Sequence, residues 1–376
     1  MQKKRILLIA SEAGSLVHFR GDLIKHLVKN KYEVYAAAPG IGKIVKQELI
    51  KLGVIPIVFS LQRTGLNPIK DLISIFQLKS IISKYQINMV FPYTIKPVIY
   101  GSIAARIARV PVVSLITGLG FTFSASSNKA KFLQYITEIM YKVALRKNET
   151  IIFQNSDDIE LFQKRKVIGI KQQVEIVNGS GVNLEKYPYR VNKNKTARIV
   201  FIIVARLIEE KGINLFIDAA EVLKEDFPNA EFHVIGTPGV SPSAIKLEKL
   251  EDLHTSNTIV YHGHKKNVPD FLFASDVFVL PTFYREGIPR SILEALSVGM
   301  PIITTNTPGC KETVLKGSNG LLIEPKNLDS LINAMRYFLE NPSKIEEMGV
   351  NSRKLAEDKF NVDIINKRIL NILQRE

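Results

Sequence analysis

The sequence has little cysteine and no long apolar run. Cys310 is the single cysteine in 376 residues, which excludes an intrachain disulfide framework and a cysteine-rich zinc module and suits a reducing cytoplasm. The longest stretch without a charge, 110–128, contains two glycines, four serines and two threonines, so it lacks the roughly 20 predominantly apolar residues of a membrane span. At the N-terminus only 6–10 is uninterruptedly apolar, which is too short for a signal-peptide core and fits a first strand. We therefore expect a soluble, intracellular protein.

Signatures of several common enzyme classes are missing as well. The chain has neither the dinucleotide-binding pattern G-x-G-x-x-G nor the phosphate-binding loop G-x-x-x-x-G-K-[ST], which argues against simple NAD dehydrogenases and P-loop ATPases. It has no G-x-S-x-G nucleophile elbow. Of the six histidines, His262 and His264 lie two apart, but no acidic or cysteine partner stands at ligand spacing. We expect no metal site, and a core or base-stacking role for this pair.

Positive charge is in excess and is unevenly distributed. The net charge is +15, and residues 1–190 hold 28 basic and 12 acidic residues, so the first half carries +16 and the remainder −1. A general solubility device is the alternative explanation, but it would have spread over both halves. The asymmetry indicates an anionic partner for the first half. Because neither an aromatic-rich RNA-binding signature nor a zinc-finger pattern is present, we favour an anionic membrane surface and expect no nucleic acid.

Two stretches of the basic half, 68–85 and 129–147, are predicted to form amphipathic helices. In each, apolar residues recur at helical spacing with lysines or arginines beside them. Basic amphipathic helices can lie in a bilayer interface, where each Lys or Arg contributes on the order of 1 kcal/mol. Most apolar stripes of helices pack on a sheet, so we expect these stripes to be buried while the charges around them serve the membrane.

Short β-rich runs alternate with helical patterns along the chain and start again after a polar, basic linker at 189–198. The predicted strands are 5–10, 33–37, 55–59, 88–92, 111–115, 150–154, 174–177, 199–204, 231–235, 259–261, 277–280, 301–304 and 321–323. This alternation predicts an α/β protein with two parallel, doubly wound sheets that face each other across a cleft. We place an N-terminal domain at 1–190 and a C-terminal domain at 191–359, with a last helix at about 360–376 that can pack back on the first domain.

The strongest candidate for a site is the segment E-G-I-P-R-S-I-L-E at 286–294. It follows a predicted strand, and Pro289 suits the first turn of a helix. Backbone N–H groups at a helix start can bind an anion, Glu286 beside them can accept hydrogen bonds from substrate hydroxyls, and Glu294 can hold a diol. The alternative is that both residues are ordinary surface carboxylates near a helix start.

A second candidate is A-R-L-I-E-E-K-G at 205–212, which directly follows a predicted strand. Arg206 can bind a diphosphate with two hydrogen bonds, and Lys211 adds a point charge. A salt bridge to Glu209 or Glu210 is the alternative for this basic pair.

Glycines lie in the turns after several predicted strands, at Gly14, in T-G-L-G at 117–120, and at Gly236. A glycine lets a ligand approach the backbone closely. Each turn alone is a weak signal.

The order of these segments resembles that of the family 4 glycosyltransferases, which have the GT-B architecture of two facing Rossmann-like domains. The second half carries, in order, A-R-L-x-x-x-K-G, F-H-V-I-G, A-S-D-V-F-V-L-P, E-G-I-P-R-S-I-L-E-A, M-P-I-I-T-T and G-x-N-G-L-L-I. In the first half, G-S-L-V-H-F-R, L-N-P-I-K-D-L and I-T-G-L-G-F resemble a branch that builds capsular, O-antigen and similar bacterial glycans on lipid carriers. The resemblance spans nearly the whole chain.

The resemblance implies a role for each candidate residue. The implied catalytic residues are Glu286, which contacts the donor sugar, and Arg206 and Lys211, which bind the nucleotide diphosphate and stabilise its departure. The implied donor-binding residues are Gly14, Gly236, Gly287, Ile288 and Glu294, the last of which holds the ribose hydroxyls. The implied acceptor-side residues are His18, Arg20 and Thr117. Many members carry a histidine where this chain has Thr117, so we expect a binding role there and no proton handling.

The implied activity is transfer of a sugar, an N-acetylhexosamine or a related hexose, from a UDP-sugar to a polyprenyl-diphosphate-linked glycan, with retention of configuration and without a cofactor or metal. We expect the protein to act at the cytoplasmic face of the membrane, as a peripheral enzyme of surface polysaccharide biosynthesis. One alternative is a non-hydrolysing UDP-sugar 2-epimerase, whose extra acid/base residues we do not find. The other is a non-catalytic partner that binds sugar nucleotides.

Overall fold

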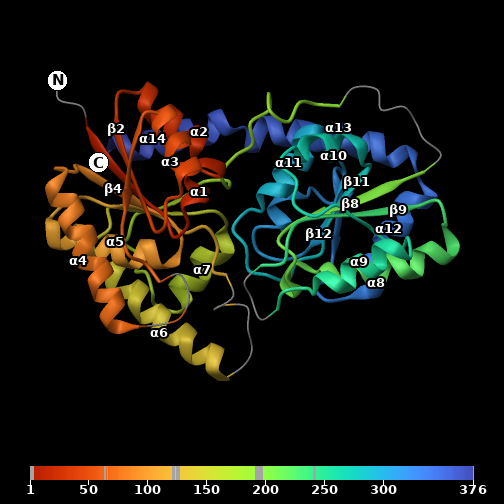
Figure 1. Ribbon diagram of the computed structural model, residues 1–376, viewed down its shortest axis with the longest axis horizontal. Helices are drawn as coiled ribbons and strands as arrows, with labels where there is room; N and C mark the ends of the chain where they lie inside the picture. Colours follow the sequence, from red (N-terminus) through yellow and green to blue (C-terminus); the bar gives the residue numbers. More distant parts are fainter. Residues whose placement is uncertain are drawn as a thin grey trace. The chain divides into compact units, whose positions relative to one another are not determined.

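The computed structural model describes residues 4–62, 65, 67–120, 123, 128–190, 198–239 and 243–375. The chain divides into two compact units (Figure 1). Unit 1 consists of Met1–Ser180 and Val362–Glu376, and unit 2 of Gly181–Asn361. Most of the predicted linker, 191–197, lies outside the described residues.

Unit 1 is built on parallel strands. They are β1 (Arg5–Ile9), β2 (Glu33–Ala38), β3 (Val54–Val58), β4 (Met89–Pro92), β5 (Val113–Leu115), β6 (Thr150–Phe153) and β7 (Val174–Ile176). Their order is β3-β2-β1-β4 in one sheet and β5-β6-β7 in another. Isolated parallel bridges, Val90 to Val112 and Tyr93 to Leu115, connect β4 with β5. The chain winds outward from β1 in one direction and from β4 in the other, which is the doubly wound arrangement.

Alternate residues of the strands build two cores, one on each face of the sheet. The helices of unit 1 are α1 (Ala13–His18), α2 (Gly21–Lys29), α3 (Lys43–Lys51), α4 (Pro68–Lys84), α5 (Ile95–Ala108), α6 (Asn128–Leu145), α7 (Ser156–Lys164) and α14 (Val362–Arg375). Leu7 and Ile9 face one core, to which α4, α5 and α6 contribute, whereas Ile6 and Leu8 face the other, to which α1, α2 and α14 contribute. A parallel sheet covered on both faces explains why its strands are apolar almost throughout.

The C-terminal helix belongs to unit 1. Ile365, Ile369 and Leu373 of α14 are buried in the same core as Leu23 and Leu27 of α2. In Figure 1 the blue α14 accordingly lies beside the red α2. The chain thus begins and ends in one unit.

Unit 2 repeats the same design with one parallel sheet in the order β10-β9-β8-β11-β12-β13. Its strands are β8 (Val200–Val204), β9 (Glu231–Ile235), β10 (Val260–Tyr261), β11 (Val277–Leu280), β12 (Ile302–Thr305) and β13 (Gly320–Ile323). Its helices are the short η2 (Glu209–Lys211), α8 (Ile213–Asp226), α9 (Leu247–Thr255), α10 (Val268–Ala274), α11 (Arg290–Val298), the short η3 (Lys311–Thr313), α12 (Leu328–Glu340), α13 (Ser343–Leu355) and the π-helical η4 (Ala356–Phe360).

The structure confirms the α/β fold class, and each predicted strand is present with ends within two residues of those expected. The units divide at Ser180 and Gly181, ten residues before the boundary placed on the polar linker. The reason is that Val182 and Tyr187 are buried in the core of unit 2. Within the described ranges, every helix is too short or too polar to cross a membrane.

Candidate functional site

The main candidate residues of unit 2 lie where the winding of its sheet reverses. β8 and β11 are neighbours, and the chain continues from β8 toward β9 but from β11 toward β12. In doubly wound sheets ligands bind at such a reversal, at the carboxyl ends of the strands. Arg206 and Lys211 follow β8, and Glu286 follows β11.

Backbone contacts hold these two loops against each other. Gly212 has φ +76, and a Cβ there would collide with the Pro281 carbonyl, so only glycine fits. The carbonyl of Glu210 accepts hydrogen bonds from the N–H groups of Phe283 (2.9 Å) and Tyr284 (3.1 Å) and from a threonine hydroxyl of the same loop. The turn that carries Lys211 is therefore fixed on the loop that leads to Glu286.

Lys211 and Glu286 form an ion pair, although they are 75 positions apart in the sequence. Their side chains are only 11% and 15% exposed, so each charge has lost most of its water and depends on the other. Lys211 thus pairs with a distant carboxylate and not with Glu209 or Glu210, the local partners considered for it. Glu210 instead accepts a hydrogen bond from the Ser243 hydroxyl at 2.7 Å.

Arg206 is exposed and lies near the same place. Its guanidinium carbon is 6.0 Å from the centre of the Tyr284 ring, and the Lys211 ammonium is 5.7 Å from that centre. Tyr284 thus connects the two cations through its ring face. Sequence reasoning missed this residue, although it stands only two positions before Glu286.

The segment after Glu286 is packed against a third loop. Gly309, with φ +80, follows β12, and a Cβ on it would collide with the carbonyl oxygen of Gly287. Ile288 is buried at 7% exposure. Burial raises the pKa of the neighbouring Cys310 thiol to about 11, and the Glu286 carboxylate adds to the rise. Gly309 is a second residue that the motifs did not reveal; its signal is the Pro-Gly turn after the predicted strand.

Glu294 lies in the second turn of α11, and Pro289 is the N-cap of this helix rather than part of its first turn. The Glu294 carboxylate accepts a hydrogen bond from Arg290 Nε at 3.0 Å. Burial, together with the same carboxylate, raises the pKa of the Tyr187 hydroxyl. Glu294 therefore stands between a cation and a buried phenol, which hold its carboxylate in one place.

Gly236 closes the loop after β9 onto the start of the Arg206 segment. A Cβ on Gly236 would collide with the Ala205 carbonyl, and the Tyr261 hydroxyl donates to the Gly236 carbonyl at 3.2 Å. Glycine is required at this position because the Ala205 carbonyl of the same protein lies so close, whereas the sequence had suggested a close approach by a ligand.

Among the described residues there is no group of three His, Cys, Asp or Glu side chains placed to hold a metal ion. His262 is half-buried and packs on Phe271 with ring centres 4.7 Å apart. Burial lowers its pKa to about 4, and the nearby His233 contributes to the shift, so the ring is neutral at pH 7. His262 thus has a packing role, whereas His264 is exposed.

In unit 1, Gly14 and His18 both belong to α1, which follows β1. A Cβ on Gly14 would make only ordinary contacts, the nearest ring atom of His18 being 3.6 Å away, so the helix itself does not require glycine. Arg20 was expected on the acceptor side, but it is only 3% exposed. Its guanidinium lies 5.1 Å from the centre of the Tyr93 ring, so the charge of Arg20 packs against this ring and is hardly exposed to solvent.

The corresponding reversal of unit 1 lies between β1 and β4 and contains a strained residue. Thr94, two residues after β4 and directly before α5, has φ +69, which a β-branched residue rarely adopts. Its hydroxyl donates to Ser11 Oγ at 3.0 Å, and Ser11 follows β1. Burial raises the pKa of the adjacent Tyr93 to about 12. Thr117 is half-buried in the loop after β5, and Phe121 of the same motif lies outside the described residues, as does Leu66 of the motif at 66–72.

Both halves of the chain match known families. A model of glycosyl transferases group 1 matches residues 188–355, and a model described as glycosyl transferase 4-like matches residues 5–155. The UDP-Gal:alpha-D-GlcNAc-diphosphoundecaprenol alpha-1,3-galactosyltransferase of Escherichia coli is 31% identical over 79% of this chain and 78% of its own length. The N,N'-diacetylbacillosaminyl-diphospho-undecaprenol alpha-1,3-N-acetylgalactosaminyltransferase of Campylobacter jejuni is 28% identical over 99% of this chain and 98% of its own.

Solved structures share the fold at lower identity. The glycosyltransferase of Rickettsia africae aligns with a TM-score of 0.78 and 18% identity, over 100% of this chain and 99% of that one. The Anabaena protein Alr3699/HepE, solved in complex with UDP and glucose, aligns with a TM-score of 0.77 and 19% identity, over 99% of this chain and 100% of that one.

Proposed function

The chain belongs to the glycosyltransferases of the group 1 and 4-like type, with the GT-B fold, and from this premise we propose that it is a retaining enzyme acting on a lipid-linked acceptor. In the proposed reaction a sugar, an N-acetylhexosamine or a related hexose, passes from a UDP-sugar to a polyprenyl-diphosphate-linked glycan. The two relatives named above support the acceptor, since both names contain a diphospho-undecaprenol. The neighbour solved with UDP supports the nucleotide.

One observation carries the proposal: Lys211 and Glu286 meet at the β8/β11 reversal, with Arg206 at the same tyrosine ring. Two cations next to one carboxylate match the charges of a departing sugar, because the diphosphate gains negative charge while the sugar carbon becomes positive. Fixed charges at the places where charge develops are usually the largest catalytic contribution. Arg206 and Lys211 thus face the diphosphate, and Glu286 faces the sugar.

In the proposed reaction, the bond between the anomeric carbon and the diphosphate oxygen breaks ahead of attack. The acceptor hydroxyl oxygen then bonds to the same face of that carbon, and its proton passes to the departing phosphate oxygen. This route retains the configuration and requires no side chain as a base. The backbone around Gly287 and Ile288 contacts the donor, Glu294 holds the ribose hydroxyls, and His18 and Thr117 contact the acceptor from unit 1.

We expect the enzyme to keep its activity in the presence of a chelator, because Arg206 and Lys211 provide the positive charge. We also propose that the basic first half holds the protein on the cytoplasmic face of an anionic membrane.

A thermal-shift panel of sugar nucleotides tests the donor, and transfer to synthetic polyprenyl-diphosphate acceptors tests the reaction. We expect one UDP-sugar to raise the unfolding temperature and to be consumed only with acceptor present, giving a product of the same anomeric configuration. Epimerised UDP-sugar without acceptor would identify an epimerase instead. Full biological function in Glu286→Ala and Lys211→Ala variants would identify a non-catalytic partner, and an inverted product would refute the retaining mechanism.

A further inference from the structure

Helices α4 and α6 present large apolar side chains to solvent. The exposed residues are Ile69, Leu72, Ile73 and Phe76 on α4 and Phe132, Tyr135, Ile139 and Val143 on α6, each 46–73% exposed. These eight are among twenty exposed large apolar side chains in the described part of the chain, only four of which lie in unit 2. The expectation that both stripes pack on a sheet is therefore only partly right. Ile75 and Leu78 of α4 are buried in the core, whereas the other apolar residues of its predicted stripe, Ile69, Leu72, Ile73 and Phe76, are exposed.

The two helices expose these side chains on one layer of unit 1. α4 packs on α5, α5 packs on α6, and all three contribute to the same core on one face of the sheet. Each helix follows one parallel strand and precedes the next, so the three run in the same direction. Their first halves therefore lie toward the carboxyl ends of the strands, the edge that also carries Gly14 and Thr117. The exposed side chains of α4 and α6 thus belong to one helix layer, on either side of α5, and we call them together the α4/α6 face.

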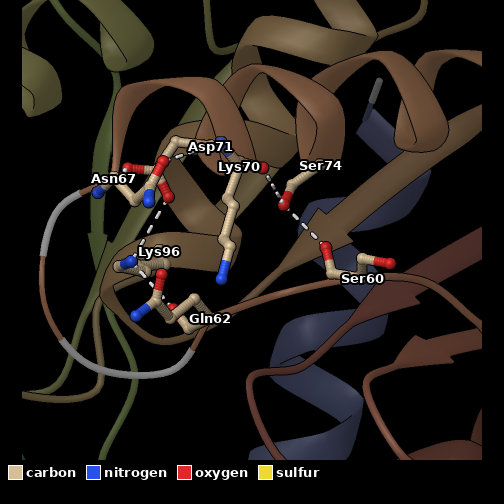
Figure 2. Close-up of polar contacts among 7 residues, drawn as sticks. All are labelled: Ser60, Gln62, Asn67, Lys70, Asp71, Ser74 and Lys96. Carbon is tan, nitrogen blue, oxygen red and sulfur yellow. Dashed lines mark hydrogen bonds and ion pairs between the residues drawn. The ribbon is translucent and has the colours of Figure 1, made fainter.

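The charge of this face has one sign, because its acidic residues point inward. The acid of α4, Asp71, is 7% exposed and pairs with Lys96 of α5 at 3.3 Å, as Figure 2 shows. The side chain of Asn67 caps the helix start by accepting from the Lys70 N–H at 3.1 Å, which fixes the first turn in this orientation. The lysines Lys70, Lys84, Lys131 and Lys142 remain exposed on the two helices.

The acid of α6 is shielded in a similar way. The side chain of Glu138 is only 12% exposed, accepts a hydrogen bond from Gln134 at 2.8 Å and lies 3.9 Å from Arg165. Neither carboxylate is thus available to repel an anionic surface. A soluble protein partner would have no evident reason to require apolar and exclusively positive side chains together, whereas an anionic bilayer accepts both.

We infer that the α4/α6 face inserts into the surface of an anionic lipid bilayer. The apolar side chains enter the boundary between headgroups and acyl chains, and the lysines lie among the anionic headgroups. Apolar burial and lysine contacts together satisfy the two signals that stable but reversible anchoring needs. The inference deepens the proposed function and rests on it, since an acceptor with a polyprenyl anchor resides in that bilayer. It adds the exposed apolar side chains of these two helices, of which only the charges were expected to serve the membrane.

The absence of tryptophan from the sequence allows a direct test with single reporters. We would prepare the full chain with Phe76→Trp or Phe132→Trp and, as a matched control, Ile44→Trp, which is 71% exposed on α3. Vesicles of phosphatidylcholine alone are compared with vesicles that also contain phosphatidylglycerol. On anionic vesicles we expect the emission of both face reporters to shift to shorter wavelength and to be quenched by brominated acyl chains, while the control remains unchanged.

The inference is overturned if neither face reporter shifts, or if the Ile44 control shifts equally. A shift that grows with protein concentration in the absence of vesicles would instead identify a second copy of the chain as the occupant. Binding that needs no phosphatidylglycerol would remove the role of the lysines.

A second experiment separates this inference from the proposed reaction. The double variant Ile69→Gln/Phe76→Gln should partition onto anionic vesicles about tenfold less than the wild type, because two apolar contacts are lost. The control Ile44→Gln/Ile170→Gln should bind as the wild type does. With a short-chain acceptor in detergent, transfer by both variants should stay within about twofold of the wild type, since the changed residues lie outside the site. Transfer by the wild type together with undiminished vesicle binding by the face variant would refute the face and leave the reaction standing. Insertion without any transfer would refute the reaction and leave the face standing.

Discussion

Replacing Lys211 by methionine separates the catalytic role of the ion pair with Glu286 from its structural role. Methionine keeps most of the length and apolar stem of lysine but removes the charge. Glu286 then remains in a place where its side chain is only 15% exposed, without the ammonium that now balances it. The variant should therefore be less stable as well as less active.

The size of the stability loss follows from the burial. Removing one partner of a fully buried pair costs about 3–5 kcal/mol, because the other charge is left uncompensated. Here the side chains of Lys211 and Glu286 retain 11% and 15% of their exposure, so water solvates the remaining charge in part. We expect a loss of about 2 kcal/mol, which lowers the unfolding temperature of a unit of this size by roughly 4–8 °C. Adding Glu286→Gln removes the stranded charge and should restore most of that loss.

Activity should respond differently. Both single variants and the double variant should lose about 10²–10³-fold in transfer rate, the range for removing one group that stabilises developing charge. Thermal unfolding and transfer from a labelled UDP-sugar measure the two effects, with Lys249→Met as control, since the exposed Lys249 ammonium donates only to the uncharged Asn214 Oδ1, at 3.1 Å, in the described structure. The reasoning is refuted if Lys211→Met unfolds within about 1 °C of the wild type and keeps its rate, or if the double variant regains activity.

Three further predictions concern unit 2. Gly309→Ala should lower the free energy of unfolding by about 3 kcal/mol or more and abolish transfer, because its Cβ would collide with the loop after Glu286. The control Gly317→Ala, at φ +73 in open space, should lower it by only about 1 kcal/mol. Urea unfolding measures both losses. The pKa of His262 is lowered to about 4, so between about pH 6.5 and 4 this residue is protonated in the unfolded chain but not in the folded one. The free energy of unfolding should therefore fall as the pH drops through this range. At pH 5 the variant His262→Gln should recover about 1 kcal/mol of it, whereas the control His264→Gln should not. Cys310, buried and with a pKa raised to about 11, should react with a thiol reagent at pH 8 at least roughly a hundredfold more slowly in the native than in the denatured protein, and fast labelling of folded protein would contradict its burial.

The fold could be predicted from the sequence because its signal is local. Each strand of a parallel sheet covered on both faces is a short apolar run, and each run is separated from the next by a helical pattern. The boundary between the units is not local. Val182 and Tyr187 precede the polar linker in the sequence, but they pack in the core of unit 2. The change of composition at the linker therefore lies ten residues after the boundary between the units.

The site could be predicted in part for the same reason. Residues at the carboxyl ends of β8 and β11 must meet, because the winding reverses between these strands, and Lys211 does pair with Glu286. Tyr284 and Gly309 were missed, since their roles depend on three loops that converge from distant parts of the chain. Arg20 stays a prediction for the acceptor side, but the sequence did not reveal that its guanidinium is buried beside an aromatic ring.

Helix α4 shows most clearly what a periodic pattern cannot decide. It is apolar around most of its circumference, so one stripe can bury Ile75 and Leu78 while another exposes Ile69 and Phe76. The orientation of the first turn is fixed both by the Asn67 cap and by Asp71, which is buried on the inner side and pairs with Lys96 of the next helix. The inward position of this carboxylate joins α4 to α5 and also removes the acid of α4 from the surface that its lysines share with apolar side chains. A variant such as Asp71→Asn, which keeps the shape but weakens the contact with Lys96, should therefore loosen the first turn of α4, and faster hydrogen exchange of the backbone amides in that turn would show it.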